Sequence, residues 1–211
     1  VRMPASNDLF PPSEFDTWAE HYDRSVCEES VFPFDGYERV LQKIVELSNA
    51  QPGQAVLDLG AGTGNLGLYF TKQGCDLTCT DFSEAMLAKA RLKLPQARFL
   101  LHDLRAPLSA GHFDAIVSAY VFHHFPLEQK IEICARLVRD HLAPAGKLVI
   151  GDISFASQTA LEDFKRTISD WDDEFYWLAD QSLAAFKKAD FELSYIQVSA
   201  CAGVYTLLGR R

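Results

Sequence analysis

Two adjacent histidines, His123 and His124, stand in the segment AYVFHHF at residues 119–125. An imidazole can bind a metal ion, accept a proton near neutral pH, or pack and hydrogen-bond inside a core. Neighbouring residues on a strand or an extended loop point in opposite directions, so we do not expect both rings to face one pocket. The pair alone does not predict a metal site, and the roles of general base and of packing both stay open.

The cysteines do not supply a metal site either. The five of them are scattered along the chain, and none belongs to a CxxC pair. Such spacing is typical of reduced thiols that pack in a core, not of a zinc site or a disulfide framework. We therefore expect no bound metal.

A glycine-rich segment, VLDLGAGTGNLG at residues 56–67, lies where a predicted strand turns into a predicted helix. Glycine permits positive φ and close approach of a ligand to the backbone, and the helix that follows offers unpaired N–H groups. Counted from Gly62, the spacing satisfies the GxGxxG pattern of nicotinamide dehydrogenases, a pattern that is weak by itself. The segment predicts a cofactor-binding loop and leaves the cofactor open.

Three aspartates stand at the ends of successive predicted strands. Asp58 stands two residues before Gly60, where a carboxylate would repel a pyrophosphate and favours a ligand with positive charge. Asp81 follows about twenty residues after the loop, where a carboxylate can accept both hydroxyls of a ribose. Asp103 ends the third predicted strand and is placed to accept a hydrogen bond from an adenine amino group. Together they predict a ligand site along the carboxyl edge of a sheet.

Strands and helices alternate along most of the chain, which predicts a parallel sheet with helices on both faces. The strand periods cover 54–60, 75–81, 97–103, 113–120, 147–153, 192–202 and 204–211. Helical periods cover 13–26, 34–47, 65–73, 83–94, 127–142 and 182–191, and Ser83 is the expected N-cap of its helix. The last two strands have little between them, so they must pair antiparallel.

The length of 211 residues predicts a single domain. We divide it into an N-terminal helical cap (1–50), a cofactor-binding core (51–156), a substrate lid (157–182), and a closing helix and hairpin (183–211).

The composition limits the classes of molecule that the protein is expected to bind. Twenty Lys and Arg against 29 Asp and Glu give a formal net charge of −9, which opposes binding to nucleic acid. No apolar run approaches the roughly 18 to 20 residues that cross a bilayer, and the first residues lack the apolar core of a signal peptide. We expect a cytoplasmic protein, a monomer or homodimer, whose partner is a small molecule, with no nucleic acid and no membrane.

The combined pattern resembles the class I S-adenosylmethionine-dependent methyltransferases over most of the chain. Their D-x-G-x-G-x-G signature is matched by Asp58, Gly60, Gly62 and Gly64, their acidic residue after the second strand by Asp81, and their D-L pair by Asp103 with Leu104. The resemblance implies a Rossmann-like α/β fold, with a seven-stranded, mostly parallel sheet, helices on both faces and a C-terminal antiparallel hairpin.

The resemblance also implies where the cofactor lies. The glycine loop would pass under the methionine part, with Asp58 near its amino group, Asp81 on the ribose and Phe82 against the adenine. In similar small bacterial enzymes a W-A-x-x-Y-D pattern, here Trp18 to Asp23, contributes a tyrosine near the methionine carboxylate. The predicted cofactor-binding residues are Tyr22, Asp58, Gly60, Ala61, Gly62, Gly64, Asp81, Phe82, Asp103, Leu104 and Ser118.

The sulfonium of such a cofactor carries its own electrophilic methyl, so the protein mainly aligns the acceptor, and a base is needed only when the acceptor must lose a proton. The resemblance implies that His123 faces the cofactor, as the candidate base, and that His124 packs beneath it. Tyr120 and Asp152, at the ends of two predicted strands, are expected to line the acceptor pocket, as are Trp171 and Tyr176.

Residues 171–177 hold four aromatics among acidic residues. They could form a lid over an apolar or cationic substrate. Alternatively, Trp171 and Phe175 form the core stripe of a helix at i, i+4 while the acids face water.

Three functions follow as hypotheses. The first is methyl transfer from S-adenosylmethionine to a small molecule. A nicotinamide-dependent oxidoreductase would use the same loop but fits poorly with Asp58 and the final hairpin. A non-catalytic module that binds S-adenosylmethionine is the third.

Overall fold

The structure is a computed structural model that describes residues 23, 26, 32–169 and 171–209. Its strands are β1 (Ala55–Leu59), β2 (Asp76–Asp81), β3 (Arg98–Leu101), β4 (Phe113–Ala119), β5 (Leu142–Phe155), β6 (Trp177–Leu178), β7 (Leu193–Gln197) and β8 (Ala202–Leu208). Its helices are α3 (Tyr37–Ser48), α4 (Gly67–Lys72), α5 (Glu84–Lys93), the 3₁₀ helix η1 (Phe122–His124), α6 (Leu127–Asp140), α7 (Gln158–Lys165) and α8 (Ala179–Lys188).

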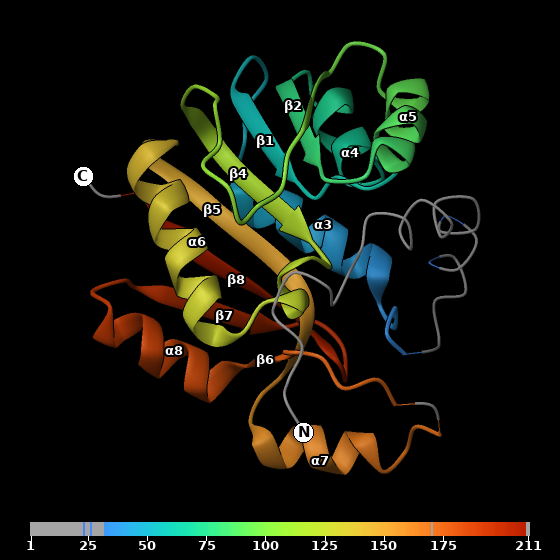
Figure 1. Cartoon of the computed structure of the whole chain (residues 1–211), viewed down its shortest axis with the longest axis vertical. Helices are drawn as coiled ribbons and strands as arrows, with labels where there is room; N and C mark the ends of the chain where they lie inside the picture. Colours follow the sequence, from blue (N-terminus) through green and yellow to red (C-terminus); the bar gives the residue numbers. More distant parts are fainter. Residues whose placement is uncertain (1–22, 24–25, 27–31, 170, 210–211) are drawn as a thin grey trace.

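The strands form one sheet in the order β3-β2-β1-β4-β5-β8-β7, and β6 pairs with β5 off this path (Figure 1). The pairs from β3 across to β5 are parallel, whereas β8 is antiparallel to both β5 and β7. The strand order reverses between β1 and β4, and the loops that follow these two strands diverge there. The predicted Rossmann-like fold with a C-terminal antiparallel hairpin is confirmed.

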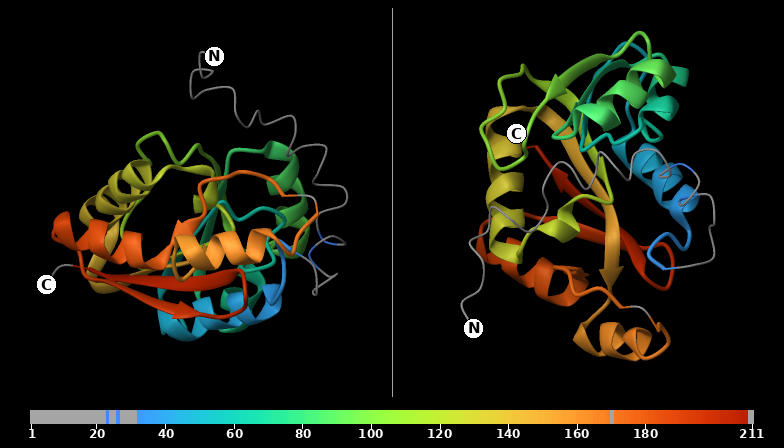
Figure 2. Two further views of the ribbon diagram at one scale, coloured as in Figure 1. Left: turned by 90° about the horizontal axis from the view of Figure 1, so that it is seen from below. Right: turned by 45° about the vertical axis from the view of Figure 1, so that its right-hand side comes forward.

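Each face of the sheet carries its own apolar core. Val56 of β1 packs in one cluster with Val40 and Ile44 of α3, and Leu57, its neighbour on β1, packs in the other. The second cluster includes Ile133 of α6 and the apolar side of α8. Figure 2 shows α3 and α6 on opposite sides of the sheet. Alternate strand residues point to opposite faces, which is why near-continuous apolar runs fold here as doubly covered strands.

Several boundaries differ from the sequence prediction. The predicted strand over 147–153 is the central part of the longer β5, and the preceding helix α6 ends at Asp140. The closing helix α8 starts at Ala179, inside the segment 157–182 that we assigned to the lid. The predicted helix over 13–26 lies outside the described residues except for Asp23 and Val26, which are helical. The predicted N-cap is confirmed, because Ser83 Oγ accepts a hydrogen bond of 3.1 Å from the backbone N–H of Met86.

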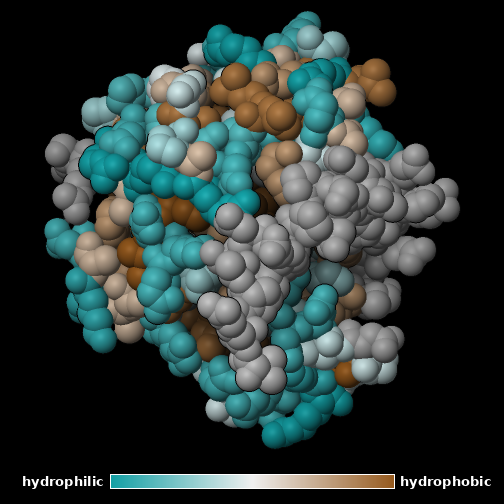
Figure 3. Space-filling model, in the orientation of Figure 1, coloured by the Kyte–Doolittle hydropathy of each residue, from teal (hydrophilic) through white to brown (hydrophobic). Residues whose placement is uncertain are grey.

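The surface is mixed in character. Large apolar side chains are exposed at Leu92 next to the end of α5 and at Leu100 and Leu101 on the edge strand β3. Figure 3 shows brown, apolar atoms over the upper part of the molecule, where α5 and its neighbouring strands lie. Among the described residues, no helix has both the length and the apolar character needed to cross a bilayer.

Candidate cofactor and acceptor site

A pocket opens at the carboxyl edge of the sheet, where the order of strands reverses between β1 and β4. The loop after β1 forms one wall, the end of β4 another, and α3 contributes a tyrosine. The lining residues are Tyr37, Asp58, Gly60, Ala61, Gly62, Asn65, Leu66 and Ala119. Four of the predicted cofactor-binding residues, Asp58 and the run from Gly60 to Gly62, are thus brought together.

The loop has a backbone shape that favours glycine. Gly60 and Gly62 have φ of 64° and 53°, in the left-handed region that other residues rarely adopt. A Cβ on Gly60 would lie 2.4 Å from Val121 Cγ2, whereas a Cβ on Gly62 would meet no atom within 4 Å. Gly60 is therefore needed for close packing against the loop after β4, and Gly62 leaves open space on the pocket side.

Asp58 is the chemically unusual residue of this pocket. Its side chain is fully buried within β1, and Oδ2 has no hydrogen-bond partner among the described residues. Burial, and after it the negative charge of Asp81, raises the pKa of Asp58 to about 7. A buried carboxylate oxygen without a donor fits a ligand that brings a positively charged N–H group to this point.

Asp81 ties the loop to the end of β2. Its Oδ2 accepts a hydrogen bond of 2.8 Å from the N–H of Gly62, and its Oδ1 accepts one of 2.9 Å from the N–H of Ser83. The peptide N–H of Ala61 donates to the carbonyl of Thr80 over 2.8 Å. The carboxylate thus fixes the loop as well as standing next to the pocket.

Asp103 lies two residues beyond the end of β3 and not at its last residue. Both of its carboxylate oxygens accept hydrogen bonds from the guanidinium of Arg105, at distances between 2.6 and 3.0 Å. The hydrogen bonds from Arg105 are the main reason that the pKa of Asp103 is lowered. Leu104 next to it packs into the core cluster that contains α6, outside the pocket lining.

Two further predicted residues have other surroundings. Ser118 is buried in β4, and its hydroxyl donates a hydrogen bond of 2.8 Å to the carbonyl of Leu59. Phe82 follows β2 directly and is partly exposed. Neither belongs to the residues that line the pocket.

The tyrosine nominated from the early W-A-x-x-Y-D pattern, Tyr22, lies outside the described residues. The last residue of that pattern, Asp23, holds the glycine loop in place: its Oδ1 accepts a hydrogen bond of 2.6 Å from Thr63, and its Oδ2 lies 2.7 Å from Lys93 Nζ. Asn65 also donates to Asp23. We did not assign these loop contacts from the sequence, although Asp23 belongs to a motif that was visible there.

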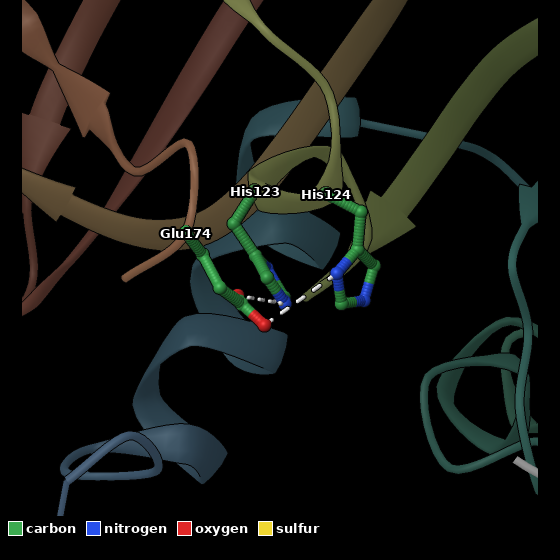
Figure 4. Close-up of side chains that lie close together, drawn as sticks. All are labelled: His123, His124 and Glu174. Atoms are coloured by element: carbon green, nitrogen blue, oxygen red, sulfur yellow. Dashed lines mark ion pairs between the residues drawn. The ribbon is translucent and has the colours of Figure 1, made fainter. Parts of the chain in front are cut away.

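The two histidines lie side by side on η1, so the prediction that their rings face opposite directions is wrong. A 3₁₀ helix turns by about 120° per residue, which keeps successive side chains much closer than in an extended loop. The ring centroids of His123 and His124 are 4.1 Å apart. Figure 4 shows both rings directed toward the carboxylate of Glu174, which comes from the segment before β6. Of the two, His123 is the more deeply buried.

Asp152 holds His123 from the sheet side. It is fully buried within β5, not at the end of the strand, and pairs across the ladder with Gly203. Its Oδ1 lies 2.6 Å from His123 Nδ1, its Oδ2 accepts the backbone N–H of His123 over 2.8 Å, and Trp177 Nε1 donates to Oδ2 over 3.1 Å. Asp152 is therefore a support beneath the histidine and not part of an open pocket wall.

Charges around His123 determine its titration. Burial is the largest influence and lowers the pKa, but the negative charges of Asp152 and Glu174 outweigh it, so the pKa of His123 is raised above its ordinary value. Burial lowers the pKa of His124 to about 3 and the pKa of Lys130 to about 8. Burial also raises the pKa of Glu174. The Lys130 ammonium donates to the carbonyl of Phe175 and lies 4.6 Å from the centre of the Trp177 ring.

The aromatic segment before β6 is not helical, so the core stripe at Trp171 and Phe175 is wrong. The side chain of Phe175 is 44% exposed, whereas the Trp171 ring stacks on Phe32 with centroids 5.0 Å apart. Tyr176 packs edge-on against Trp171. Irregular backbone lets alternate side chains point to solvent and to the protein, which a helix over the same residues would not allow.

Tyr120 follows β4 and packs against the pocket. It has a positive φ of 57°, an uncommon conformation for a residue with a Cβ. Its ring stacks on Tyr37, and its buried hydroxyl has no hydrogen-bond partner among the described residues. Strain and an unpaired hydroxyl at one position are features that concentrate at functional sites.

The family model and two relatives that match this chain are all described as methyltransferases. A family model described as a methyltransferase domain matches residues 56–146. An uncharacterized methyltransferase from Geobacillus kaustophilus is 33% identical over 200 residues, which are 88% of this chain and 91% of the relative. Another, from Oceanobacillus iheyensis, is 31% identical over 198 residues, with coverage of 88% and 91%.

Solved structures share the fold at low sequence identity. The complex of DhpI with SAH has a TM-score of 0.73 at 19% identity, covering 95% of this chain and 96% of DhpI. The magnesium protoporphyrin IX methyltransferase of Synechocystis PCC 6803 with bound SAH has a TM-score of 0.73 at 16% identity, covering 95% and 98%. Together with the curated relatives and the fold, these matches show that the chain belongs to the class I S-adenosylmethionine-dependent methyltransferases.

Proposed function

We propose that this protein transfers the methyl group of S-adenosylmethionine to a small-molecule acceptor at the carboxyl edge of the sheet. The observation that carries the proposal is the buried Oδ2 of Asp58, which has no hydrogen-bond partner among the described residues and belongs to a residue that lines the same pocket as Gly62. S-adenosylmethionine has an ammonium group that can donate to such an oxygen and an electrophilic methyl on its sulfonium.

Residues in and around the loop would each bind a different part of the cofactor. Asp58 accepts from the ammonium of the methionine part, and the open space at Gly62 admits that part against the backbone. Asp81 stands at the end of the neighbouring strand β2 for the ribose, with Phe82 beside the adenine. Asp103 would take the adenine amino group in place of one of its hydrogen bonds to Arg105. This arrangement also explains the carboxylate of Asp58 just before the loop, which would repel the pyrophosphate of a nicotinamide cofactor.

His123 is the group that we assign to the acceptor proton. Its Nδ1 faces Asp152, which holds the ring and keeps the proton on Nδ1, so that the lone pair of Nε2 points away from the sheet. An imidazole with this orientation can remove a proton from an acceptor hydroxyl, thiol or ammonium group as the methyl arrives. The proximity of Glu174 to Nε2, at 3.3 Å, places the same atom next to the segment before β6.

The acceptor would lie between His123 and the aromatic residues of the lid. Trp171 and Tyr176 belong to an aromatic cluster with Phe32, Phe155 and Phe164, which gives the lid a rigid apolar base. The exposed acids Asp172 and Asp173 border it. This combination favours a small acceptor with an apolar body and no strong negative charge.

Calorimetric titration with S-adenosylhomocysteine and with NADH tests the cofactor assignment directly. We expect one-to-one binding of S-adenosylhomocysteine and no heat with NADH at the same concentrations. Binding of NADH instead would replace the proposal with the oxidoreductase, which uses the same type of loop.

A further inference from the structure

Two histidines and a glutamate, all potential metal ligands, lie close together beside the proposed acceptor position. Nε2 of His123, Nδ1 of His124 and a carboxylate oxygen of Glu174 all lie within 4.8 Å of one another (Figure 4). Two of these residues come from η1, and the third comes from a segment about fifty residues later. We propose that this cluster, His123, His124 and Glu174, binds a divalent transition-metal ion of the Zn²⁺ type.

The spacing of the donor atoms fits such an ion. Zinc binds imidazole nitrogen and carboxylate oxygen at roughly 2.0–2.2 Å, so two ligands at a tetrahedral angle are about 3.3–3.5 Å apart. Oε2 of Glu174 lies 3.3 Å from His123 Nε2, and the other carboxylate oxygen, Oε1, lies 3.7 Å from His124 Nδ1. One donor atom from each residue lies within 4.8 Å of the other two, so a small closing movement of the side chains would bring the three donors around one ion.

The chemical type of the donor atoms indicates which class of metal ion would bind. Two imidazoles and one carboxylate form the ligand set of catalytic zinc sites and of other transition-metal sites with an open position. Mg²⁺ and Ca²⁺ prefer oxygen ligands, and only one of these three residues supplies oxygen. A bound ion would therefore keep at least one coordination position for water or for another ligand.

The surroundings of His123 match the outer shell of a metal site. A histidine that binds a metal through one nitrogen usually donates its other N–H to a carboxylate, which fixes the tautomer and the ring orientation. Asp152 occupies this place at 2.6 Å from Nδ1, and Trp177 and the backbone N–H of His123 hold Asp152 in turn. A lone pair on Nε2 facing a carboxylate oxygen is repulsive, and a cation between the two atoms removes the repulsion.

Charge around the cluster is also compatible with a cation. Asp152 and Glu174 contribute two carboxylates, and Lys130 is the nearby ammonium that opposes them. The Lys130 ammonium donates to the carbonyl of Phe175 and lies over the Trp177 ring. A metal on Nε2 also takes the lone pair that we assign to the acceptor proton, so ion binding and proton removal compete at one atom.

Zn²⁺ titration of the full chain, without a polyhistidine tag and at about pH 7.5, tests the proposal independently of methyl transfer. We expect one-to-one binding that weakens about tenfold or more in both Glu174→Gln and His124→Ala, because each removes one of three ligands. Asp173→Asn, a change of a neighbouring exposed acid, is the matched control and should bind Zn²⁺ like the unaltered protein. Binding of S-adenosylhomocysteine confirms that each variant is folded.

Co²⁺ provides a second readout that identifies the donor atoms. Visible bands without a thiolate charge-transfer band would show nitrogen and oxygen ligands and exclude the cysteines of the chain. The proposal is wrong if the unaltered protein does not bind Zn²⁺, if both variants bind it with unchanged affinity, or if Co²⁺ gives the thiolate band. In the first case a shared proton, and not a metal ion, joins His123 and Glu174.

Discussion

Asp152 lies directly beneath His123, accepting the backbone N–H of the histidine with Oδ2 over 2.8 Å and approaching its Nδ1 with Oδ1 at 2.6 Å. One buried carboxylate thereby fixes both the main chain and the ring of the same residue. Because Asp152 belongs to β5 and His123 to the 3₁₀ helix after β4, the contact ties β5 to the segment that follows β4.

Replacing His123 with alanine tests its role as a base. We expect turnover with an accepted substrate to fall by about 10²- to 10⁴-fold, the usual contribution of a positioned base. Affinity for S-adenosylhomocysteine should stay within about twofold, because His123 does not line the cofactor pocket. Turnover is measured with a metal chelator present and cofactor affinity by calorimetry. His141→Ala, which removes another buried histidine, is the control, and unchanged turnover in His123→Ala would remove the base assignment.

Asp152→Asn tests whether the charge of Asp152 controls the titration of His123. The carboxylate raises the pKa of His123, so an amide, which is neutral and would turn its NH2 group toward Nδ1, should lower that pKa. The histidine then loses its proton at lower pH, and the rising limb of turnover against pH should move to lower pH. A purely structural role would reduce turnover without moving the profile, which is the result that contradicts this prediction.

Asp58→Asn should weaken the binding of S-adenosylhomocysteine. A hydrogen bond to a charged group contributes about 1.5–3 kcal/mol, which corresponds to roughly 10- to 150-fold in affinity. Calorimetry measures the effect, and Asp76→Asn is the matched control because Asp76 pairs with Arg98 at the other end of β2. Equal affinity in Asp58→Asn and the unaltered protein would show that the carboxylate does not contact the cofactor.

Stability of the cofactor-free protein should depend on the pH through Asp58. Its pKa is about 7 in the folded protein against 3.8 for the ordinary group, so between these values the folded state holds more protons than the unfolded state. The free energy of unfolding should then fall as the pH rises from about 4 to about 7, by at most about 1.4 kcal/mol per pH unit. Urea unfolding measures the free energy of unfolding of the unaltered protein and of Asp58→Asn at each pH. The difference between the two values gives the contribution of Asp58. A difference that does not change between about pH 5 and about pH 7 would contradict it.

A pair of glycine substitutions tests the open side of the loop. Gly62→Ala and Gly53→Ala both place a Cβ at positive φ with no atom within 4 Å, so the backbone cost should be similar, about 1–2 kcal/mol. Of these two glycines, Gly62 lines the pocket and Gly53 does not, so Gly62→Ala should weaken S-adenosylhomocysteine binding and Gly53→Ala should not. Equal binding by the two variants would mean that the cofactor does not approach Gly62.

The strand periods predicted most of the fold because each core strand is apolar on both faces and is bounded by glycine, proline or polar turns. The features that the strand periods did not predict depend on tertiary contacts. β5 continues to Phe155 because Ser154 and Phe155 pair with β6, a two-residue strand without a periodicity of its own. The start of α8 at Ala179 follows directly from that pairing and was likewise invisible in the helical period.

The cofactor loop was predictable because its chemistry lies in one short segment, from Asp58 to Gly64. The contacts around His123 and His124 could not be predicted in this way. Glu174 meets the two histidines only because β6 brings its segment back across β5, and no local pattern encodes that contact. The orientation of His123 and His124 was also missed, since a single turn of 3₁₀ helix and an extended loop share the same sequence signals.

The most direct measurement is incubation of the protein with methyl-labelled S-adenosylmethionine and a metabolite extract, followed by separation of small molecules from macromolecules. We predict that the label appears in a small-molecule product together with S-adenosylhomocysteine, and that formation of this product falls in His123→Ala. Label in a nucleic acid or protein fraction, or cofactor binding without any transfer, would contradict the account.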